Sequence, residues 1–284
     1  MREKVTLRTL FTMKREEIPA SLITAYDFPS ATFADRAGMD ALLVGDSGGM
    51  TMLGRPSTLS VTMNEMIHFA KAVGAAKTSA FVIGDMPFMS YQASNREAVR
   101  NAGRFIAEAH CDAVKLEGGV RMAKRIAAIR EAGIIVMAHL GLNPQSMALQ
   151  SGCRVQGRTL HERQELINDA IAVEKAGASL ILLEAMPEAT AHQVKKSVNI
   201  PVYGIGAGGK LDGQLLILHD VLGTFVGDIQ PKFTKRYLNG AELITNALKA
   251  YVRDVRGKQF PSKEHLYSPA KVLEWNSSLE TEKH

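Results

Sequence analysis

The sequence predicts an α/β protein built as a closed (β/α)8 TIM barrel, with a short helix ahead of the first strand. Short apolar runs of strand length alternate with helix-patterned segments along the 284 residues, which is typical of parallel βα units. Many of these runs end in a polar residue, as in Gly45-Asp46 and Gly84-Asp85. Polar strand ends along the whole chain favour a closed barrel over an open sheet. The length suits one barrel, so we expect residues 1–284 to form a single domain.

The first half of the chain begins with an amphipathic segment over residues 6–15, which we expect to cover one end of the barrel or to contact another subunit. The apolar runs that follow predict strands over residues 21–27, 41–46, 81–85 and 113–119. Helical patterns predict helices over residues 29–36, 62–74, 93–109 and 120–132. A long glycine-containing loop over residues 48–62 follows the second strand, and long loops on a rigid scaffold tend to be functional.

The second half repeats this alternation up to a polar C-terminal tail. We expect strands over residues 134–139, 180–184, 201–206 and 215–218. The expected helices cover residues 161–176, 188–197 and 232–255. The tail from about residue 261 is polar and is expected to wrap the surface.

Composition limits the classes of partner. The formal charge of +5 and the pI near 9.1 suit anionic small molecules, but no Lys/Arg block with interleaved aromatic residues indicates nucleic acid. The sequence has no apolar run long enough for a membrane span. Cys111 and Cys153 do not suggest a disulfide framework, so we expect a soluble protein of the reducing cytoplasm.

Three carboxylates, Asp46, Asp85 and Glu117, end the second, third and fourth predicted strands. Because neighbouring strands lie about 4.8 Å apart, we expect these side chains to converge. Three adjacent carboxylates repel one another unless a proton or a cation neutralises them. Oxygen ligands alone favour Mg²⁺ over Zn²⁺. The alternative is that each acid separately caps a helix or forms a salt bridge.

Three further polar residues lie at predicted strand ends. Lys115 alternates with Glu117 and should share its face, where it would bind a substrate carboxylate or simply pair with Glu117. His139 could orient or donate to a substrate, or act as a structural hydrogen-bonding group. Glu184, across the mouth from the three acids, suits a general base, with an ion pair as the alternative. The glycines at 204–209 formally match a dinucleotide motif, but their position favours a tight turn.

Several motifs together resemble one known family, ketopantoate hydroxymethyltransferase, over about residues 5 to 267. The motifs occur in family order: Thr24-Ala25-Tyr26-Asp27, Val44-Gly45-Asp46-Ser47, Gly84-Asp85-Met86-Pro87-Phe88, Val114-Lys115-Leu116-Glu117-Gly118, His139-Leu140-Gly141-Leu142, Val155-Gln156-Gly157, Gly204-Ile205-Gly206-Ala207-Gly208, Asp212-Gly213-Gln214, Pro231-Lys232-Phe233 and Phe260-Pro261.

The resemblance implies a (β/α)8 barrel that uses Mg²⁺ and transfers a one-carbon unit from methylenetetrahydrofolate to 3-methyl-2-oxobutanoate (2-oxoisovalerate), giving ketopantoate. It implies a metal site of Asp46, Asp85 and Glu117. It implies that Glu184 is the catalytic base. Contacts to the keto acid are expected from Asp46, Ser47, Asp85, Lys115 and His139. Bacterial members are commonly decamers, so the resemblance implies a homo-oligomer.

Some positions depart from the family pattern, and we expect them in loops that rim the mouth, where they could alter substrate preference. They are Gly48-Gly49, Arg55-Pro56, Asn143, Cys153 and Leu211. Two rival functions stay open from the sequence. One is a Mg²⁺-dependent 2-keto-acid carbon–carbon lyase of the phosphoenolpyruvate mutase/isocitrate lyase superfamily. The other is a non-catalytic barrel that binds a ligand or serves in assembly.

Overall fold

Eight parallel strands form a closed barrel in the computed structural model, which describes residues 2–149, 152, 154–227 and 231–267. The strands pair in chain order, and β8 pairs with β1 to complete the ring. They are β1 (Ala20–Thr24), β2 (Ala41–Val44), β3 (Phe81–Asp85), β4 (Ala113–Glu117), β5 (Ile135–Gly141), β6 (Leu180–Glu184), β7 (Val202–Ile205) and β8 (Gly213–Leu216). The predicted barrel is therefore confirmed.

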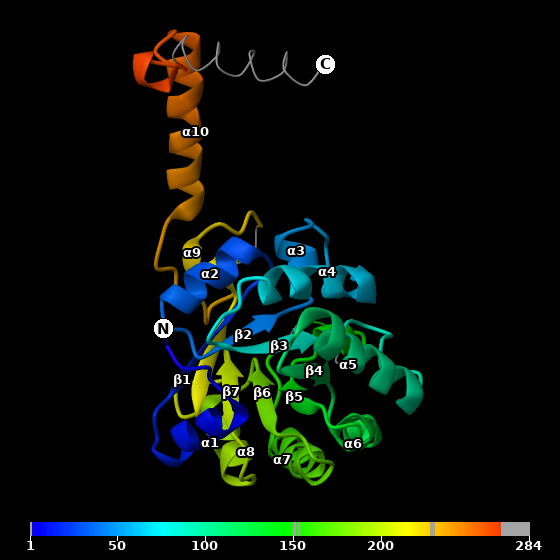
Figure 1. Ribbon diagram of the computed structural model, residues 1–284. Coiled ribbons are helices and arrows are strands. Elements are labelled where there is room, and N and C mark those ends of the chain that lie inside the picture. The colour runs from blue at the N-terminus through cyan, green and yellow to red at the C-terminus, as the bar shows by residue number, and fades with distance from the viewer. Residues whose placement is uncertain (1, 150–151, 153, 228–230, 268–284) are drawn as a thin grey trace, which may run out of the picture.

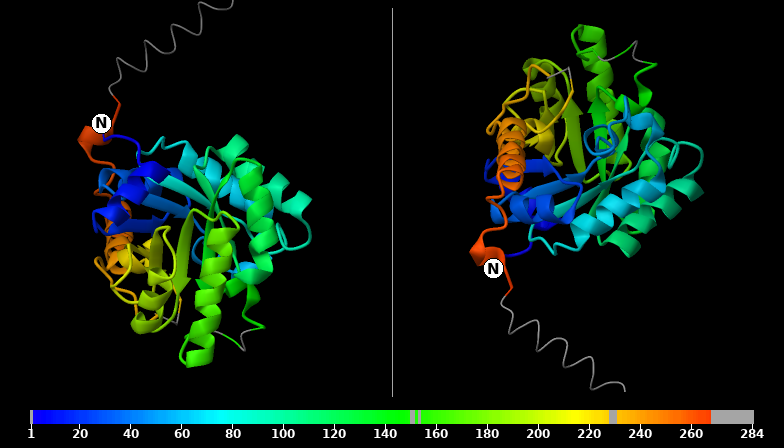
Figure 2. Two further views of the ribbon diagram at one scale, coloured as in Figure 1. Left: turned by 90° about the horizontal axis from the view of Figure 1, so that it is seen from below. Right: turned by 90° about the horizontal axis from the view of Figure 1, so that it is seen from above.

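Helices surround the strands on the outside of the ring (Figures 1 and 2). The α-helices are α1 (Leu7–Arg15), α2 (Phe28–Arg36), α3 (Gly48–Thr51), α4 (Met63–Gly74), α5 (Asn95–Ala109), α6 (Ala123–Glu131), α7 (Leu160–Lys175), α8 (Glu188–Lys196), α9 (Leu218–Leu222) and α10 (Gly240–Arg256). Short 3₁₀ helices are η1 (Thr58–Ser60), η2 (Val120–Met122), η3 (Pro144–Ser146) and η4 (Lys263–His265). Capping boxes at Thr62 and Thr159 fix where α4 and α7 begin.

The apolar side chains form two cores separated by the barrel wall. One core lies between the strands and the outer helices, and Leu42, Met66 and Phe105 belong to it. The other fills the inside of the barrel and includes Phe81, Leu182 and Tyr203. Side chains alternate across a strand, so each strand contributes to both cores. This explains why the barrel strands are apolar on both faces.

The N-terminal helix α1 covers the amino-terminal ends of the strands. Its Leu10 is buried and packs with the inner core. Its Lys14 places Nζ 2.9 Å from Asp212 Oδ2, just ahead of β8. The expectation that this segment closes one end of the barrel is confirmed. The polar residues at the carboxyl ends of the strands lie at the opposite end.

Six of the eight predicted strands differ from the structure by one to three residues at an end, and the first and the last differ for clear physical reasons. The first ends at Thr24 rather than at Asp27, because the Asp27 carboxylate accepts a hydrogen bond from Ser30 N and caps α2. The last begins at Gly213, two residues earlier than expected, and Gly213 and Gln214 pair with β1. Glycine and glutamine weakened the apolar pattern there, so only the second half of β8 was visible in the sequence.

The general alternation of strands and helices ends before the last two strands of the barrel. Among residues 206–212, which are all described, no helix separates β7 from β8. Only the five-residue α9 follows β8 directly. The last long helix begins at Gly240 instead of residue 232, because Asn239-Gly240 starts it after an irregular segment. As a result, the seventh and eighth strands lack long covering helices from their own βα units.

Helix α10 projects away from the barrel, and the described part of the tail, residues 261–267, lies at its far end (Figure 1). The expectation that the tail wraps the barrel surface was wrong for these residues, and residues 268–284 lie outside the described part of the chain. In the described residues of α10 only Gly240 is buried. No helix in the described part of the chain has the length and apolar character needed to span a bilayer.

Candidate active site at the mouth of the barrel

The inward-facing positions of β3 to β6 change from apolar to polar toward the carboxyl ends of the strands. On β4, Ala113 belongs to the inner core, and Lys115 and Glu117 follow at intervals of two. On β5, Met137 is followed in the same way by His139. Asp85 and Glu184 occupy the last positions of β3 and β6. Strand alternation therefore brings the predicted polar residues together at one end of the barrel.

Asp85 and Lys115 form a buried ion pair. They are register partners on β3 and β4, and Lys115 Nζ lies 2.7 Å from each carboxylate oxygen of Asp85. Burial alone would lower the pKa of Lys115, but the charges of Asp85, Asp46 and Glu117 outweigh it and raise that pKa above its ordinary value. Lys115 is thus a fixed cation, and the prediction that it shares the inner face with Glu117 is confirmed.

Asp46 comes directly after β2 and lies against this ion pair. Its backbone N–H donates to Asp85 Oδ2 at 3.1 Å. Burial and the neighbouring Asp85 charge raise the pKa of the Asp46 carboxyl well above its ordinary value. Ionisation of Asp46 therefore costs more free energy here than in water, and an additional cation would reduce that cost.

His139 lies between two carboxylates. Its Nδ1 is 3.4 Å from Glu117 Oε1 and its Nε2 is 3.1 Å from Glu184 Oε2. Both distances are within the range of ion pairs, but neither ring nitrogen has the geometry of a hydrogen bond to these carboxylates. Burial works to lower the pKa of His139, yet the two glutamates raise it to about 9. The imidazolium therefore links the end of β4 to the end of β6.

Ser47 makes its side-chain contact with Tyr26. Its hydroxyl lies 2.9 Å from the Tyr26 hydroxyl, and Tyr26 is buried after β1. The site residues Asp46, Asp85, Lys115, Glu117, His139 and Glu184 thus form one connected layer, and Ser47 borders it on the side of β1.

The carboxylates suit a divalent cation by donor type, because all are hard oxygen donors. Glu117 Oε1 is buried and has no hydrogen-bond partner among the described residues, and burial together with the Asp85 charge raises the pKa of Asp46. No three His, Cys, Asp or Glu side chains of the described chain converge into a ready-made cluster, however. Lys115 already neutralises Asp85. The residues therefore fit a cation held by a few protein oxygens and completed by substrate or water oxygens.

Two buried residues of this centre were not predicted from the sequence. Gln145, from η3 after β5, donates from Nε2 to Asp46 Oδ2 at 2.9 Å and from its backbone N–H to Glu117 Oε2 at 2.9 Å. Tyr91 donates its hydroxyl to Gln145 Oε1 at 2.7 Å. Both come from loops, where no periodic pattern marks an inward side chain. The only signal was the position of Asn143-Pro144-Gln145 directly after a strand that ends in polar residues.

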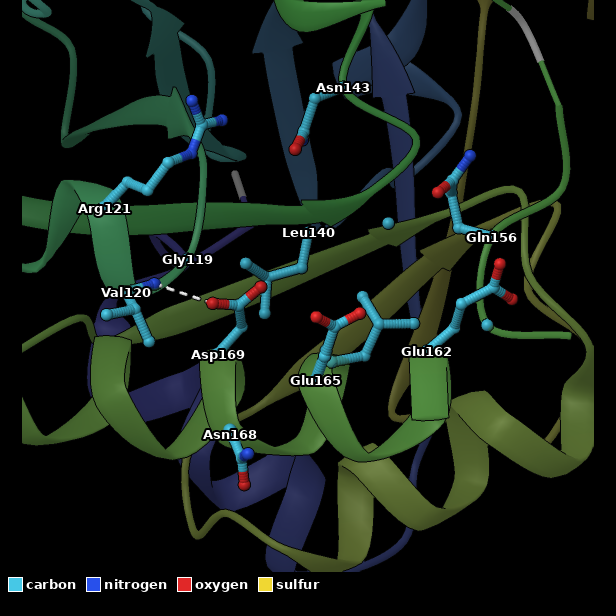
Figure 3. A pocket seen from close by; sticks show the side chains of 13 residues that line it. Gly119, Val120, Arg121, Leu140, Asn143, Gln156, Glu162, Glu165, Asn168 and Asp169 are labelled. Carbon is cyan, nitrogen blue, oxygen red and sulfur yellow. Dashed lines mark hydrogen bonds between the residues drawn. The ribbon is translucent and has the colours of Figure 1, made fainter. Parts of the chain in front are cut away.

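A separate cavity of about 460 Å³ lies outside the barrel wall beside β5 (Figure 3). Helix α7 contributes Glu162, Glu165 and Asp169 to its floor, and Arg121 and Asn143 reach it from the loops above. Asp169 accepts a hydrogen bond from Val120 N at 2.7 Å. None of the predicted catalytic, metal or substrate residues lines this cavity, so it is distinct from the polar layer.

The family departures occupy different environments. Gly48 and Gly49 are buried in α3, Asn143 is buried in the loop after β5, and Arg55 forms an ion pair with Glu65. Pro56 follows in the loop between α3 and η1. Cys153 lies outside the described residues.

Leu211 was expected at the mouth but lies at the opposite end. The neighbouring Asp212 N–H donates to Val202 O, at the start of β7. The connection from β7 to β8 therefore returns to the amino-terminal end without a helix, and Leu211 is carried with it and buried.

A closed parallel barrel with acids, a lysine and a histidine at the carboxyl ends of its strands defines a (β/α)-barrel enzyme with its site at the mouth. A family model described as ketopantoate hydroxymethyltransferase matches residues 4–263. The chain belongs to the ketopantoate hydroxymethyltransferase family. It is 48% identical over 273 residues to the 3-methyl-2-oxobutanoate hydroxymethyltransferase of Carboxydothermus hydrogenoformans, covering 96% of this chain and 99% of that protein.

Solved structures share the fold at much lower sequence identity. Phosphonopyruvate hydrolase in complex with oxalate and Mg²⁺ matches with a TM-score of 0.61 and 14% identity, over 97% of this chain and 96% of the other. Phosphoenolpyruvate phosphomutase from Streptomyces platensis subsp. rosaceus matches with a TM-score of 0.61 and 17% identity, over 99% and 98% of the two chains. At these identities the matches establish the barrel fold alone.

Proposed function

We propose that this protein transfers a hydroxymethyl group from 5,10-methylenetetrahydrofolate to 3-methyl-2-oxobutanoate, giving 2-dehydropantoate (ketopantoate) for pantothenate and coenzyme A biosynthesis. The observation that carries the proposal is the near-full-length identity of 48% to a relative with that activity in its name. The polar layer at the mouth supports it, because this layer holds a buried lysine, a partly accessible glutamate and further carboxylates.

Lys115 serves to bind the keto-acid carboxylate. An ammonium group has three N–H donors, and two of them point at the Asp85 oxygens. The third has no partner among the described residues and is the one that we assign to the substrate. Because the pKa of Lys115 is raised, the group keeps its charge at neutral pH. A fixed cation at this position orients the substrate over the ends of β3 and β4.

Glu184 serves as the base that takes the C3 proton of the keto acid. It ends β6 and is the most accessible acid of the layer, with 18% of its side chain exposed. The protonated His139 beside it holds one carboxylate oxygen by charge. The proton moves from C3 to Glu184. Water replaces the two C–N bonds that hold the one-carbon unit and so releases tetrahydrofolate, and the electron pair left on C3 then forms the bond to that carbon, whose oxygen takes up a proton to become the hydroxyl group.

Asp46, Asp85 and Glu117 are the residues that would hold Mg²⁺ together with the keto acid. When bound, the cation supplies polarisation of the substrate carbonyl and stabilisation of the negative charge that develops on its oxygen. The burial of these carboxylates supports this role, because removal from water strengthens their interactions with charge.

Deuterium exchange tests this function at the first chemical step. In D₂O with Mg²⁺, the protein should exchange the C3 proton of 3-methyl-2-oxobutanoate without folate, as followed by ¹H NMR. Glu184→Gln should abolish the exchange and still bind the keto acid. Glu165→Gln, on the floor of the separate cavity (Figure 3), is the matched control and should exchange at the wild-type rate.

A coupled assay with both substrates, with and without EDTA, tests the complete reaction. Loss of ketopantoate formation on chelation is expected. A folded, Mg²⁺-loaded protein that neither exchanges the C3 proton nor forms ketopantoate would refute the proposal. Cleavage of a carbon–carbon bond in a 2-keto or 2-hydroxy diacid by that protein would instead support the superfamily lyase alternative.

We further propose that the protein acts in the cytoplasm as a homo-oligomer, with a decamer as the expected form. An amphipathic face of α10 supports self-association. Ile244, Leu248, Tyr251 and Val255 recur at helical spacing, and all are exposed in the single chain. An apolar stripe of this kind is stable in water when another apolar surface covers it. In the oligomer, the apolar face of α10 would cover the side of the barrel at β7 and β8 of a second copy of the chain. That side lacks long covering helices of its own.

A further inference from the structure

Gln145 lies at the centre of the carboxylate layer although it comes from the loop after β5. We propose that Gln145 is a positioning residue that fixes which oxygens of Asp46 and Glu117 face the substrate and its cation. The inference rests on the proposed function and adds to it a residue outside the predicted site. Gln145 is 4% exposed and belongs to η3, in the connection that follows β5.

The orientation of the Gln145 amide follows from its neighbours. Nε2 lies 2.9 Å from Asp46 Oδ2 and 3.0 Å from Met86 O, and both of these atoms only accept hydrogen bonds. Oε1 accepts from the Tyr91 hydroxyl at 2.7 Å and from Gln92 Nε2 at 3.1 Å. The side chain therefore makes all four hydrogen bonds that an amide can make. The flipped amide would place oxygen against two acceptors, so one orientation is fixed.

The backbone of Gln145 acts on a second acid. Its N–H donates to Glu117 Oε2 at 2.9 Å. Gln145 thus occupies one oxygen of Asp46 through its side chain and one oxygen of Glu117 through its main chain. The other oxygen of Glu117, Oε1, is buried without a hydrogen bond among the described residues. Gln145 therefore engages acids at the ends of two different strands, and it leaves to Glu117 the oxygen that lies 3.4 Å from His139 Nδ1 and has no hydrogen bond among the described residues.

The side-chain type matters because the site already holds four acids, one lysine and one protonated histidine. A glutamate at position 145 would add a fifth carboxylate, next to Asp46, and a lysine would add a second ammonium group that competes with a bound cation. A neutral amide donates hydrogen bonds to the carboxylate without changing the net charge. Groups that hold metal ligands in this way tune cation affinity, and their removal typically costs about 10–100-fold.

The loop that carries Gln145 also spans the mouth. Helix η3, which includes Gln145, packs against η1 from the loop after β2. Gln145 additionally bonds Met86 O and Tyr91, which follow β3. The carboxyl ends of β2, β3 and β4 are therefore connected through one residue of the β5 loop. Gln145 can orient the acids only when this loop is ordered, so the order of the loop and the orientation of the acids are coupled.

Cation affinity measured without keto acid or folate tests this role. Gln145→Met keeps the side-chain length and the backbone N–H, but it removes the donor to Asp46. We expect Mn²⁺, followed by electron paramagnetic resonance, to bind about 10–100-fold more weakly. Saturating Mg²⁺ should then recover most of the deuterium-exchange rate, which a general loss of structure would not allow. Gln156→Met is a change of the same type later in the connection between β5 and α7. The Gln156 side chain donates to Arg154 O, so this variant should bind Mn²⁺ like the wild type.

Two outcomes would overturn the inference and leave the proposed function standing. One is that a folded Gln145→Met protein binds Mn²⁺ with wild-type affinity. The other is that saturating Mg²⁺ does not restore its deuterium-exchange rate. If Gln145→Met fails to fold, Tyr91→Phe serves as the second variant. It removes the hydroxyl that donates to Gln145 Oε1 and accepts from Glu117 N, and it keeps the Gln145 side chain, so it should weaken Mn²⁺ binding to a smaller extent. Unchanged Mn²⁺ affinity in Tyr91→Phe also overturns the inference. Absence of Mn²⁺ binding by the wild type would instead contradict the cation in the proposed function.

Discussion

Lys115 Nζ lies 2.7 Å from both carboxylate oxygens of Asp85, and the two side chains are almost completely buried. The lysine acts as an internal cation at the place where the sequence predicts an external one. Its ammonium group and a bound Mg²⁺ therefore share the negative charge of the same acids. The stability of this centre without a metal depends on Lys115.

Replacement of Lys115 by methionine should destabilise the metal-free protein. Removal of one partner leaves the buried Asp85 charge without compensation, at a cost of about 3–5 kcal/mol. Added Mg²⁺ should raise the melting temperature of the variant more than that of the wild type, because the cation then replaces the lost charge. Thermal unfolding by circular dichroism, with and without Mg²⁺, measures both effects.

Lys71→Met is the matched control for this change. Lys71 pairs with Glu108 at 3.1 Å on the surface, where ion pairs contribute little, so its melting temperature should stay near the wild-type value. Wild-type stability of metal-free Lys115→Met would contradict the role of Lys115 as an internal cation.

The barrel and most of its site could be predicted because both follow from strand periodicity. An apolar run that ends in an acid places that acid at the mouth, and alternation by two places Lys115 and Glu117 on one face. Gln145 could not be predicted in this way. Its contacts join the loop after β5 to the end of β2, 99 residues earlier in the chain, and no local pattern records such a contact.

The end of the chain was less predictable for a different physical reason. Helix α10 has a clear amphipathic pattern, but the pattern does not say which surface covers its apolar face. Within one chain that face is exposed. Similarly, Gly213-Gln214 form strand β8 through pairing with β1, which outweighs their weak strand propensity.

The Arg55–Glu65 ion pair predicts a specific pH dependence of stability. The hydrogen bonds from Arg55, followed by that from Thr62 N, lower the pKa of Glu65 to about 2. A lowered pKa stabilises the folded protein at pH values above the ordinary carboxyl pKa of about 4.3. This stabilisation is lost as the pH falls from that value toward 2, because Glu65 then becomes protonated in the folded state.

Arg55→Met should therefore raise the pKa of Glu65, as measured by NMR titration of its side-chain carboxyl carbon. Thr62 N still donates to Glu65, so the new pKa should remain below the ordinary value. Arg15→Met, which removes an exposed contact with Glu16, should leave the Glu65 titration unchanged. A Glu65 pKa that does not respond to Arg55→Met would show that Thr62 alone sets it.

Gly141 controls the position of the proposed base through the backbone. It has a φ of +93°, and a β-carbon there would lie 2.3 Å from the main-chain oxygen of Glu184. Gly141→Ala should displace the end of β6 and reduce C3-proton exchange on the order of 100-fold, the effect of a displacement of about 1 Å. NMR measurement of deuterium exchange follows the loss.

Gly133→Ala provides a control with the same backbone strain. Gly133 has a φ of +85°, but no heavy atom lies within 4 Å of an added β-carbon. Both variants should lose stability from the unfavourable φ, of about 1–2 kcal/mol, and only Gly141→Ala should lose exchange. Equal exchange rates in the two variants would show that Gly141 does not control the position of Glu184.

The apolar face of α10 makes self-association directly testable. Leu248 is 61% exposed in the single chain and lies on the same helical face as Ile244 and Tyr251. Leu248→Glu should dissociate the oligomer, because burial of a carboxylate in an apolar contact is unfavourable. Asn246→Glu introduces the same charge on the polar face of the helix and should leave the assembly intact. Light scattering coupled to size-exclusion chromatography gives the mass of each variant, and equal masses for Leu248→Glu and wild type would exclude this face of α10 from the interface.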